Sequence, residues 1–357
     1  MDDLPDSDSP DLGLAHPTED ECKTIWTHTF EEWGDALTLP IYLEESRHLT
    51  SVPLAKEGGM TTWTLVDKTL PPNKRPILAS CESFRKLFLS SDPTGNTQEG
   101  IVHGIASVFC APGFRRRDYA ARLMSEMGKV LRTWQAEFGQ PMGSILYSDI
   151  GKSYYAKLGW IPNSTNTHYV FSPSSPNITW PSSAKPIKES EIGDLCRRDI
   201  STVRNAMRRP FATDKQRITI LPDLDHILWH VHRYYGLPTT KDTENVLYIL
   251  RFVVEGDETA NNPPAPQSEI NSTETKQLDA MRLARITAVL QAARVEAANW
   301  QLDAVKLWEP SPIVERLLIQ SGLEATTVVR DSDSIASGLW NTSVDALWIN
   351  NEHYAWL

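Results

Sequence analysis

The sequence lacks the marks of several protein classes. Its four cysteines are widely scattered and form no Cys-x-x-Cys pair, which favours a reducing compartment over secretion. No apolar run approaches the roughly 20 residues that a membrane-spanning helix needs, and the start of the chain has no secretory signal pattern. We therefore expect a cytoplasmic protein with no membrane contact.

Basic residues are also in short supply. The chain has 35 Lys and Arg against 46 Asp and Glu, a formal net charge of −11 at pH 7. This balance argues against a nucleic-acid partner and is compatible with a cationic or amine substrate. The motifs Gly-x-Ser-x-Gly and Gly-x-x-x-x-Gly-Lys-Ser/Thr are both absent. Of the nearby histidines His226, His230 and His232, the first two would share a helix face, but spacing places no third ligand beside them. We therefore expect packed or surface histidines and no metal.

The chain has 357 residues, which is long enough for two domains of ordinary size. Residues 1–13 are acidic and rich in Pro and Ser, which predicts a flexible tail. A Pro/Ser-rich connector at 172–188 predicts a domain boundary. The resulting domains are residues 14–175 and residues 187–357. Strands and helices that alternate along both indicate an α/β class with a mixed sheet.

The first helix has a recognisable start. Thr18 is followed three residues later by Glu21, the spacing of a capping box, and the helix is expected to end near Trp33. A second helix is predicted from Ile41 to His48. Acidic residues crowd this segment and form either a mouth that attracts an amine or a solvated helix face: Glu31, Glu32, Asp35, Glu44 and Glu45.

The most informative stretch is residues 108–124. A strand rich in Ile, Val and Phe, residues 101–110, runs into the basic turn Arg115-Arg116-Arg117-Asp118. Apolar residues then recur at three- and four-residue steps from Tyr119 to Phe138, which predicts an amphipathic helix. A helix start offers unpaired N–H groups and the positive end of the helix dipole. With three arginines, this turn is suited to a phosphate or pyrophosphate.

The order of elements that follows completes a pattern. The helix is followed by a strand at 144–149 and then by Tyr155-Ala-Lys-Leu-Gly159-Trp160. Residues 100–170 resemble the GNAT acetyltransferase superfamily, whose acetyl-CoA loop reads Arg/Gln-x-x-Gly-x-Gly/Ala. Arg115, Asp118 and Ala120 occupy that pattern here. The resemblance implies a GNAT fold with a mostly antiparallel sheet and acetyl-CoA as co-substrate.

One position departs from the superfamily. Asp118 stands where the loop usually has Gly, and it brings a side chain and a negative charge toward the pyrophosphate. Asp nevertheless tolerates unusual backbone angles and is favourable in a first helical turn. The loop therefore either still binds CoA or has lost or changed its ligand.

The resemblance also assigns roles to residues. It places the cofactor against Val108, Cys110, Arg115, Arg116, Arg117, Asp118, Tyr119 and Ala120. A backbone amide around Val108 to Cys110 would support the thioester carbonyl, and Tyr155 would protonate the leaving sulfur. The strands on either side of the pantetheine arm would splay apart.

The sequence leaves open which group is the base that removes a proton from the amine. His103 lies on the strand that leads into the site, and imidazole has a suitable pKa. Asp149 lies at the end of the next strand. Ordered waters are a third possibility.

The second half repeats the order of the first. A helix at 278–300, a strand at 303–308, a helix ending at Gly322 and a strand at 326–330 parallel the elements from 119 to 172. We predict a second, degenerate GNAT-like unit, because Leu318 stands where a Tyr is expected four residues before Gly322. A long polar insertion at 256–277 is predicted to be mobile.

Most of the chain resembles a fungal family typified by lysine N-acetyltransferase. The cues are Leu146-Tyr-Ser-Asp-Ile-Gly151, the long C-terminal half and the ending Ala346 to Trp356. The resemblance implies direct acetyl transfer in a ternary complex to a small, lysine-like amine. Alternatives are an acyltransferase with another donor or acceptor and, because of Asp118, a non-catalytic GNAT-fold binding protein.

Overall fold

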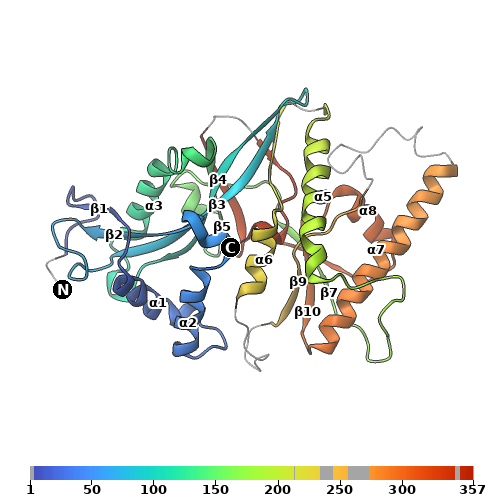
Figure 1. Cartoon of the computed structure of the whole chain (residues 1–357), viewed down its shortest axis with the longest axis horizontal. Coiled ribbons are helices and arrows are strands. Elements are labelled where there is room, and N and C mark those ends of the chain that lie inside the picture. The colour runs from blue at the N-terminus through green and yellow to red at the C-terminus, as the bar shows by residue number, and fades with distance from the viewer. Residues whose placement is uncertain (1–3, 213, 234–243, 256–272, 342–345, 357) are drawn as a thin grey trace.

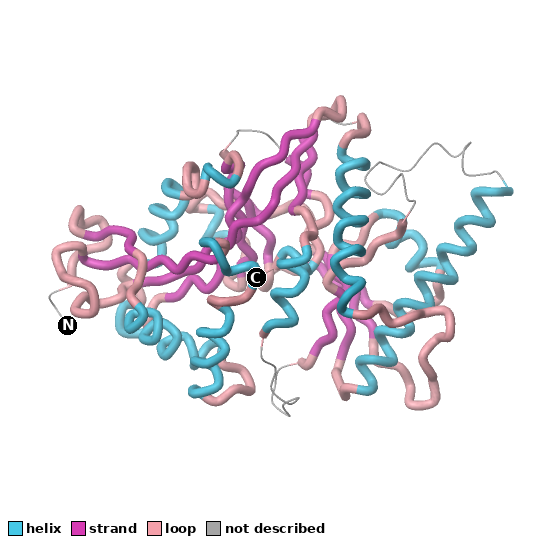
Figure 2. Tube along the Cα trace, viewed as in Figure 1, coloured by secondary structure: helices cyan, strands magenta, loops and turns pink. Residues whose placement is uncertain are grey.

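The computed structural model describes residues 4–212, 214–233, 244–255, 273–341 and 346–356. Within them, strands form a nine-stranded and a four-stranded sheet (Figures 1 and 2). The strands of the first sheet are β1 (Leu12–Ala15), β2 (Met60–Asp67), β3 (Ala79–Ser91), β4 (Thr97–Phe109), β5 (Pro141–Ser148), β6 (Ile161–Pro162), β8 (Gln216–Ile220), β12 (Ile335–Trp340) and β13 (Ala346–Trp348). Those of the second are β7 (Thr167–Phe171), β9 (Val246–Ile249), β10 (Ala304–Trp308) and β11 (Thr326–Val329).

The helices cover the faces of these sheets. In the first half they are α1 (Glu19–Trp33), α2 (Leu39–Leu49), α3 (Tyr119–Val130) and α4 (Ser153–Ala156), with short 3₁₀ turns at Pro53–Gly58, Pro112–Phe114 and Ala136–Phe138. In the second half they are α5 (Glu189–Met207), α6 (Leu224–His232), α7 (Thr273–Asn299) and α8 (Pro312–Gln320), with a turn at His353–Ala355. Figure 1 shows α3 on one side of the first sheet and α1 and α2 on the other. The first sheet therefore has two differently covered faces. No helix of the described residues is long and apolar enough to cross a bilayer.

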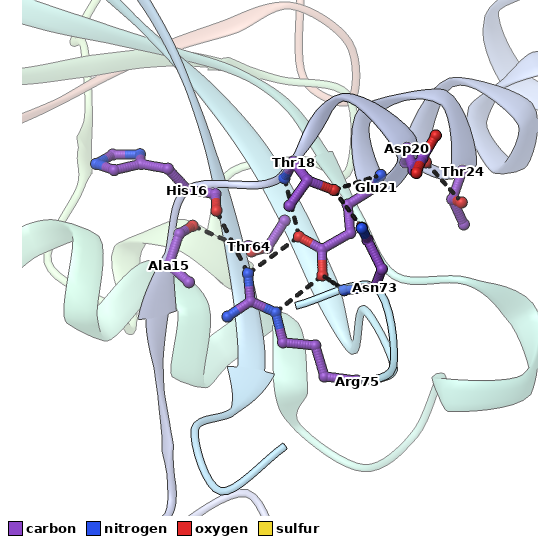
Figure 3. A network of polar contacts seen from close by, with 9 residues as sticks. All are labelled: Ala15, His16, Thr18, Asp20, Glu21, Thr24, Thr64, Asn73 and Arg75. Carbon is purple, nitrogen blue, oxygen red and sulfur yellow. Dashed lines mark hydrogen bonds and ion pairs between the residues drawn. The ribbon is translucent and has the colours of Figure 1, made fainter. Parts of the chain in front are cut away.

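The predicted capping box at the start of α1 is confirmed. The Thr18 hydroxyl accepts a hydrogen bond from the Glu21 amide at 3.1 Å, and the Glu21 carboxylate accepts one from the Thr18 amide at 3.0 Å. Glu21 also binds the Arg75 guanidinium at 2.9 Å and the Asn73 amide at 3.0 Å (Figure 3). One buried carboxylate thus fixes α1 to the loop between β2 and β3.

The predicted flexible tail is wrong for residues 4–13. Leu4 packs against the core under α3, and β1 begins at Leu12, which is 2% exposed. The Tyr119 hydroxyl donates to the Pro5 carbonyl at 2.6 Å, and the Arg122 guanidinium donates to the Ser7 carbonyl at 2.9 Å. A few well-placed apolar residues anchor a segment whose average composition is polar.

Two strands are exchanged between the halves of the chain. The first sheet contains the order β4-β5-β12-β6, and the second contains β9-β10-β7-β11. In each, a helix connects two parallel strands: α3 joins β4 to β5, and α7 joins β9 to β10. The third strand of each set is antiparallel and comes from the other half. The predicted second GNAT-like unit is therefore present, and the two units interlock.

This exchange corrects the predicted domain boundary at 175–187. β7 precedes the connector but pairs with β10 and β11 in the second sheet, whereas β8, β12 and β13 follow it and lie in the first. The connector is a surface crossing between two interwoven units. The C-terminal residues pack into the core, where Tyr354 and Ala355 are fully buried.

The predicted helix at 119–138 is shorter than its pattern suggested. α3 ends at Val130 instead of continuing to Phe138, because Trp134 packs edge-on against Trp63 and the chain turns at Gln135, whose φ is 58°. β9 ends at Ile249, because Arg251 binds Asp199 and the Phe252 amide donates to Glu352. Part of the predicted mobile insertion, residues 256–272, lies outside the described residues.

Candidate active site

The two central strands of the first sheet separate at their ends. β4 and β5 pair in parallel from Ile101 to Ile105, and the last pair is Ile105 with Leu146. β4 continues to Phe109 and β5 to Ser148 without pairing to each other. The splay expected from the resemblance is thus present, and it leaves backbone N–H and C=O groups facing a wedge-shaped gap.

A β-bulge causes the separation. The register between β3 and β4 shifts between Ser80 and Glu82, so that two residues of β4, Ser107 and Val108, lie opposite Cys81. Ser107 adopts a φ of 53°. A bulge bends its strand and increases the local twist, which turns the end of β4 away from β5.

The basic turn follows directly and leads into α3. Arg116 and Asp118 both adopt left-handed backbone angles, with φ of 64° and 57°. Asp118 therefore takes the conformation for which Gly is usually chosen, and Asp is one of the residues that tolerates it. Its side chain makes no capping hydrogen bond. The first intrahelical bond runs from the Arg122 amide to the Asp118 carbonyl at 2.9 Å, so the amides of the first turn remain available to an anion.

The arginines of the turn have different surroundings. Arg115 donates to the Cys110 carbonyl at 3.0 Å and to Glu32 of α1 at 2.8 Å. Arg116 and Arg117 are exposed on the turn, next to Asp118. Tyr119 is buried, so it holds the helix to the sheet while its neighbour Ala120 lies in the first turn. The turn is thus a cationic rim beside the gap between β4 and β5.

Tyr155 lies on the α3 side of this gap. It belongs to the same core cluster as Ile105 and Leu146, the last paired residues, and Val108 and Cys110 pack at its edge. Burial raises its pKa, and the nearby Tyr154, Cys81 and Asp149 raise it further. The phenol is therefore protonated throughout the physiological range and can donate to a group in the gap.

The short helix that carries Tyr155 is held by the residues that end it. Gly159 has a φ of 104°, which favours Gly over any side chain. Trp160 is fully buried, and its indole donates to the Ser144 hydroxyl of β5 at 3.0 Å. The Tyr-x-x-x-Gly-aromatic pattern therefore positions the tyrosine by clamping α4 onto β5.

His103 is not part of this site. It is fully buried on β4, within the region paired to β5, and contacts the Gln135 side chain at 3.2 Å. Five residues of strand, about 16 Å, separate it from Val108. Burial lowers its pKa to about 4. His103 is thus a neutral core histidine, and the prediction that it lies in the site is wrong.

Asp149 lies next to the site but is engaged elsewhere. It is exposed at the end of β5, and its carboxylate accepts a hydrogen bond from the Ser334 amide at 2.8 Å. That bond fixes the loop that leads into β12. Its nearness to Tyr155 is consistent with the predicted location, while its hydrogen bond indicates a structural task.

Glu82 is a candidate that sequence reasoning missed. It lies on β3 next to Cys81, which faces the bulge of β4, and it is on the sheet face opposite α3. Its carboxylate accepts a hydrogen bond from the Ser107 hydroxyl at 2.9 Å. Burial raises its pKa above the ordinary value. The available signal was a lone carboxylate inside an apolar strand, Leu78-Ala-Ser-Cys-Glu82. Glu82 and Tyr155 therefore flank the gap from opposite faces of the sheet.

The acidic residues in and between α1 and α2 fall into two groups, exposed and buried. Glu31, Glu32, Asp35 and Glu44 are exposed, and Glu32 pairs with Arg115. Glu45 is buried, with Arg233 3.9 Å away. Arg233 also lies close enough to Glu82 to lower its pKa against the effect of burial. The face of the sheet opposite α3 thus has a buried acidic interior beneath an acidic rim.

The arginines of α5 and the histidines of α6 are engaged in local contacts. On α5, Arg197 pairs with Asp194, Arg198 with Glu255 and Arg204 with Glu99. His226 binds Asp223 at 2.9 Å, and His230 contacts the Tyr354 carbonyl at 3.3 Å. No group of three His, Cys, Asp or Glu side chains among the described residues is arranged to hold a metal ion.

The second unit differs from the first at the equivalent positions. β9 pairs with β10 along its whole length, from Val246 to Ile249, without a splay. Leu318, the counterpart of Tyr155, is 3% exposed in the core beneath α8. The loop before α7 lies outside the described residues. The splayed strands and the tyrosine of the first unit thus have no equivalent in the described part of the second, where paired strands and a buried leucine take their places.

Comparison with known proteins agrees with this architecture. Residues 168–236 and 231–357, together more than half of the chain, match the family described as "LYC1 GNAT-like C-terminal domain". No curated protein matches the chain.

Among solved structures, a GCN5-related N-acetyltransferase from Kribbella flavida is similar at a TM-score of 0.52 and 15% identity, covering 92% of this chain and 70% of that one. N-myristoyltransferase from Saccharomyces cerevisiae is similar at 0.51 and 10% identity, covering 94% and 81%. At these identities the likeness concerns the fold. With the family match, it shows that the chain belongs to the LYC1 GNAT-like family and is an acyltransferase of the GNAT superfamily.

Proposed function

We propose that the protein transfers an acetyl group from acetyl-CoA to the amine of a small, lysine-like metabolite in a ternary complex. The observation that carries this proposal is the gap between β4 and β5, with a cationic turn beside it and Tyr155 and Glu82 on its two faces. Family membership supplies the reaction class. The solved N-myristoyltransferase with bound myristoyl-CoA is a related fold that holds an acyl-CoA.

The cofactor fits the residues present. The first-turn amides of α3, with Arg116 and Arg117 beside them, would receive the pyrophosphate. The unpaired backbone groups of residues 106–109 would bind the pantetheine amides and place the thioester in the gap. A backbone amide near Val108 would support the carbonyl oxygen as charge develops on it.

The two side chains at the gap would move the protons. An alkyl ammonium has a reference pKa of about 10.4 and must lose a proton before it attacks. Glu82 accepts that proton, since its raised pKa makes it a stronger base than an ordinary glutamate. The amine nitrogen then forms a bond to the acyl carbon, the carbon–sulfur bond breaks, and Tyr155 donates its proton to the departing thiolate. The second proton that the nitrogen loses as the amide forms returns Tyr155 to its neutral phenol. Asp149 and a water-mediated route are the alternatives for the base.

The test is a calorimetric titration of the full-length protein with acetyl-CoA and with CoA, followed by a thiol-release assay with L-lysine and other amines. Micromolar binding and lysine-dependent thiol release, with acetyl-lysine found by mass spectrometry, are expected. Binding with no amine accepted would favour another acceptor or a non-catalytic binding protein. Absence of binding at millimolar cofactor would contradict the proposal.

A further inference from the structure

Arg330 is a buried cation whose guanidinium has no hydrogen-bond or ion-pair partner in the described part of the chain. It follows β11, is 6% exposed, and its Nε, Nη1 and Nη2 atoms are all buried without a hydrogen bond. Its guanidinium lies 3.6 Å from the centroid of the Trp308 ring. That stacking leaves the in-plane N–H donors, which point away from the ring, unused.

Other buried arginines of the described chain are treated differently. Arg217 donates to the carbonyls of Met207 and Arg209 at 2.9 and 2.6 Å. Arg251 binds both oxygens of Asp199, at 2.8 and 2.9 Å. A buried charge without such partners costs several kcal/mol, so an unpaired guanidinium indicates a group that is supplied from outside.

The surroundings of Arg330 favour an anion. Burial lowers its pKa, while Glu309 acts in the opposite direction from beyond ion-pair distance. The Glu309 carboxylate already accepts hydrogen bonds from the amide and the hydroxyl of Thr167. Two neighbouring histidines, His168 and His353, each have a buried Nδ1 without a partner in the described residues. Both histidines interact electrostatically with Arg330, so all three side chains lie in one neighbourhood.

This cluster lies beside the gap between β4 and β5. The Trp308 ring is 6.1 Å from the ring of Tyr147, and Tyr147 directly follows Leu146, the last residue of β5 that pairs with β4. Tyr147 packs on the same face of the sheet as Phe88 of β3. Glu82 also points to this face, because it lies an even number of residues from Phe88 along the strand. Paired strands are about 4.8 Å apart, so β3 and β5 side chains on this face are about 10 Å apart where β4 pairs with both strands. At Glu82 and Tyr147 the separation is larger, because β4 and β5 diverge after Ile105 and Leu146.

We propose that Arg330 binds the carboxylate of an amino-acid acceptor whose side-chain amine reaches Glu82 in the gap. The proposal rests on the function proposed above and adds the acceptor's recognition site. Arg is suited to this task because its planar fork binds a carboxylate through two hydrogen bonds. Trp308 and Tyr147 supply apolar surface along which an aliphatic chain extends from one group to the other.

Tyr248 lies at the surface beside this cluster. Its side chain is 38% exposed, and its ring stacks on His353 with centroids 4.0 Å apart. Burial raises the pKa of Tyr248, while Arg330 acts in the opposite direction, so the phenol and the guanidinium lie near each other.

The experiment uses full-length protein, the variants Arg330→Met and Arg330→Lys, and three probes. L-Lysine has the amine and the carboxylate, cadaverine has the amine alone, and L-norleucine has the carboxylate without the side-chain amine. KM and kcat are measured for L-lysine and cadaverine, and calorimetry and the thermal shift report binding of L-norleucine and L-lysine. Arg217→Met is the control for removal of a buried guanidinium.

Arg330→Met is expected to raise the KM for L-lysine about 30-fold or more, to leave cadaverine turnover unchanged and to abolish the thermal shift with L-norleucine. Arg330→Lys should recover part of the L-lysine affinity. Without ligand, Arg330→Met should melt no lower than the wild type because it removes an unpaired charge, whereas Arg217→Met should melt lower.

The outcomes separate this proposal from the proposed function. If no amine is acetylated, binding of L-norleucine and L-lysine still tests Arg330 directly. An unchanged KM for L-lysine and an unchanged L-norleucine shift in Arg330→Met would overturn the subsite. So would a wild-type protein that binds neither amino acid while it acetylates cadaverine.

Discussion

Tyr155 and Glu82 lie on opposite faces of one sheet, and their proposed roles can be tested separately. Tyr155→Phe removes the proton donor and keeps the buried ring. We expect kcat to fall about 100-fold, the usual scale for one acid–base group, with acetyl-CoA affinity unchanged. Steady-state kinetics and calorimetry measure both. Tyr154→Phe, on the neighbouring ring, is the matched control and should keep its turnover; equal turnover in Tyr155→Phe would remove Tyr155 from the mechanism.

Glu82→Gln tests the base through the pH profile. Burial raises the pKa of Glu82, so the active carboxylate form is lost as pH falls through a value above that of an ordinary glutamate. Wild-type kcat/KM should decline on the acid side with that pKa. In Glu82→Gln we expect kcat to fall about 100-fold or more and the acid limb to disappear.

The control for that substitution is Glu99→Gln, on the same hairpin but paired with Arg204 at the surface. It should behave as the wild type. An acid limb that persists in Glu82→Gln would point instead to Asp149 or to ordered waters.

Asp118→Gly tests the departure in the cofactor loop. Asp118 already has a left-handed φ of 57°, so Gly fits the backbone and removes a negative charge beside the pyrophosphate. We expect the Kd for CoA to fall about tenfold, which corresponds to 1.4 kcal/mol. Calorimetry measures it. A larger Kd for CoA in Asp118→Gly would show that the aspartate contributes to binding of the ligand.

At the scale of elements, α1 depends on the Glu21 network (Figure 3). The Arg75 guanidinium, with the Asn73 and Thr18 amides, lowers the pKa of Glu21 to about 2 from 4.5. Because the folded-state pKa is depressed, this stability is complete above about pH 4.5 and is lost as pH falls toward 2. The shift corresponds to about 3 kcal/mol.

Glu21→Gln keeps the capping box but removes the charge. We expect it to lower the free energy of unfolding at pH 7 by about 3 kcal/mol and to flatten the acid dependence, both measured by chemical denaturation. Asp20→Asn, in the same first turn but exposed, should cost only a few tenths of a kcal/mol. Equal effects of the two substitutions would contradict the network's role.

Elements also show what the sequence could predict. The capping box, the strand-turn-helix of the loop and Tyr155 four residues before Gly159 depend on neighbours in the chain, and their patterns predicted them. α3 was predicted too long because Trp134 and Phe138 continue its periodicity while packing by tertiary contacts, Phe138 beneath Arg85 at 3.7 Å. An apolar period can thus continue through residues that lie outside the helix, and one of them, Phe138, is half-exposed.

Glu82, His103 and Arg330 mark the limit of that reasoning. A carboxylate, an imidazole and a guanidinium within strands or at their ends look alike in sequence whether they are solvated, paired or isolated. The bulge opposite Glu82, the Gln135 contact of His103 and the unpaired state of Arg330 all depend on distant segments. Only the folded arrangement separates a core residue from a candidate site residue.

For the whole molecule, the exchange of β7 and β12 predicts that the halves are not independent. A fragment of residues 1–175 lacks β8, β12 and β13 of its own sheet, and a fragment of 187–357 lacks β7. We expect each fragment alone to be unfolded or aggregated, and the intact chain to unfold in one calorimetric transition. Near-UV circular dichroism of the fragments measures this, and a folded fragment 1–175 would contradict it.

The same exchange has a consequence during protein synthesis. β5 ends at Ser148, and its partner β12 begins at Ile335. At translation rates of about 5–20 residues per second, the edge of β5 waits roughly 10–40 s on the ribosome before the strand that covers it is made. An uncovered edge strand is a template for wrong pairing. A nascent chain of this design therefore needs protection by chaperones until nearly its last residues have emerged.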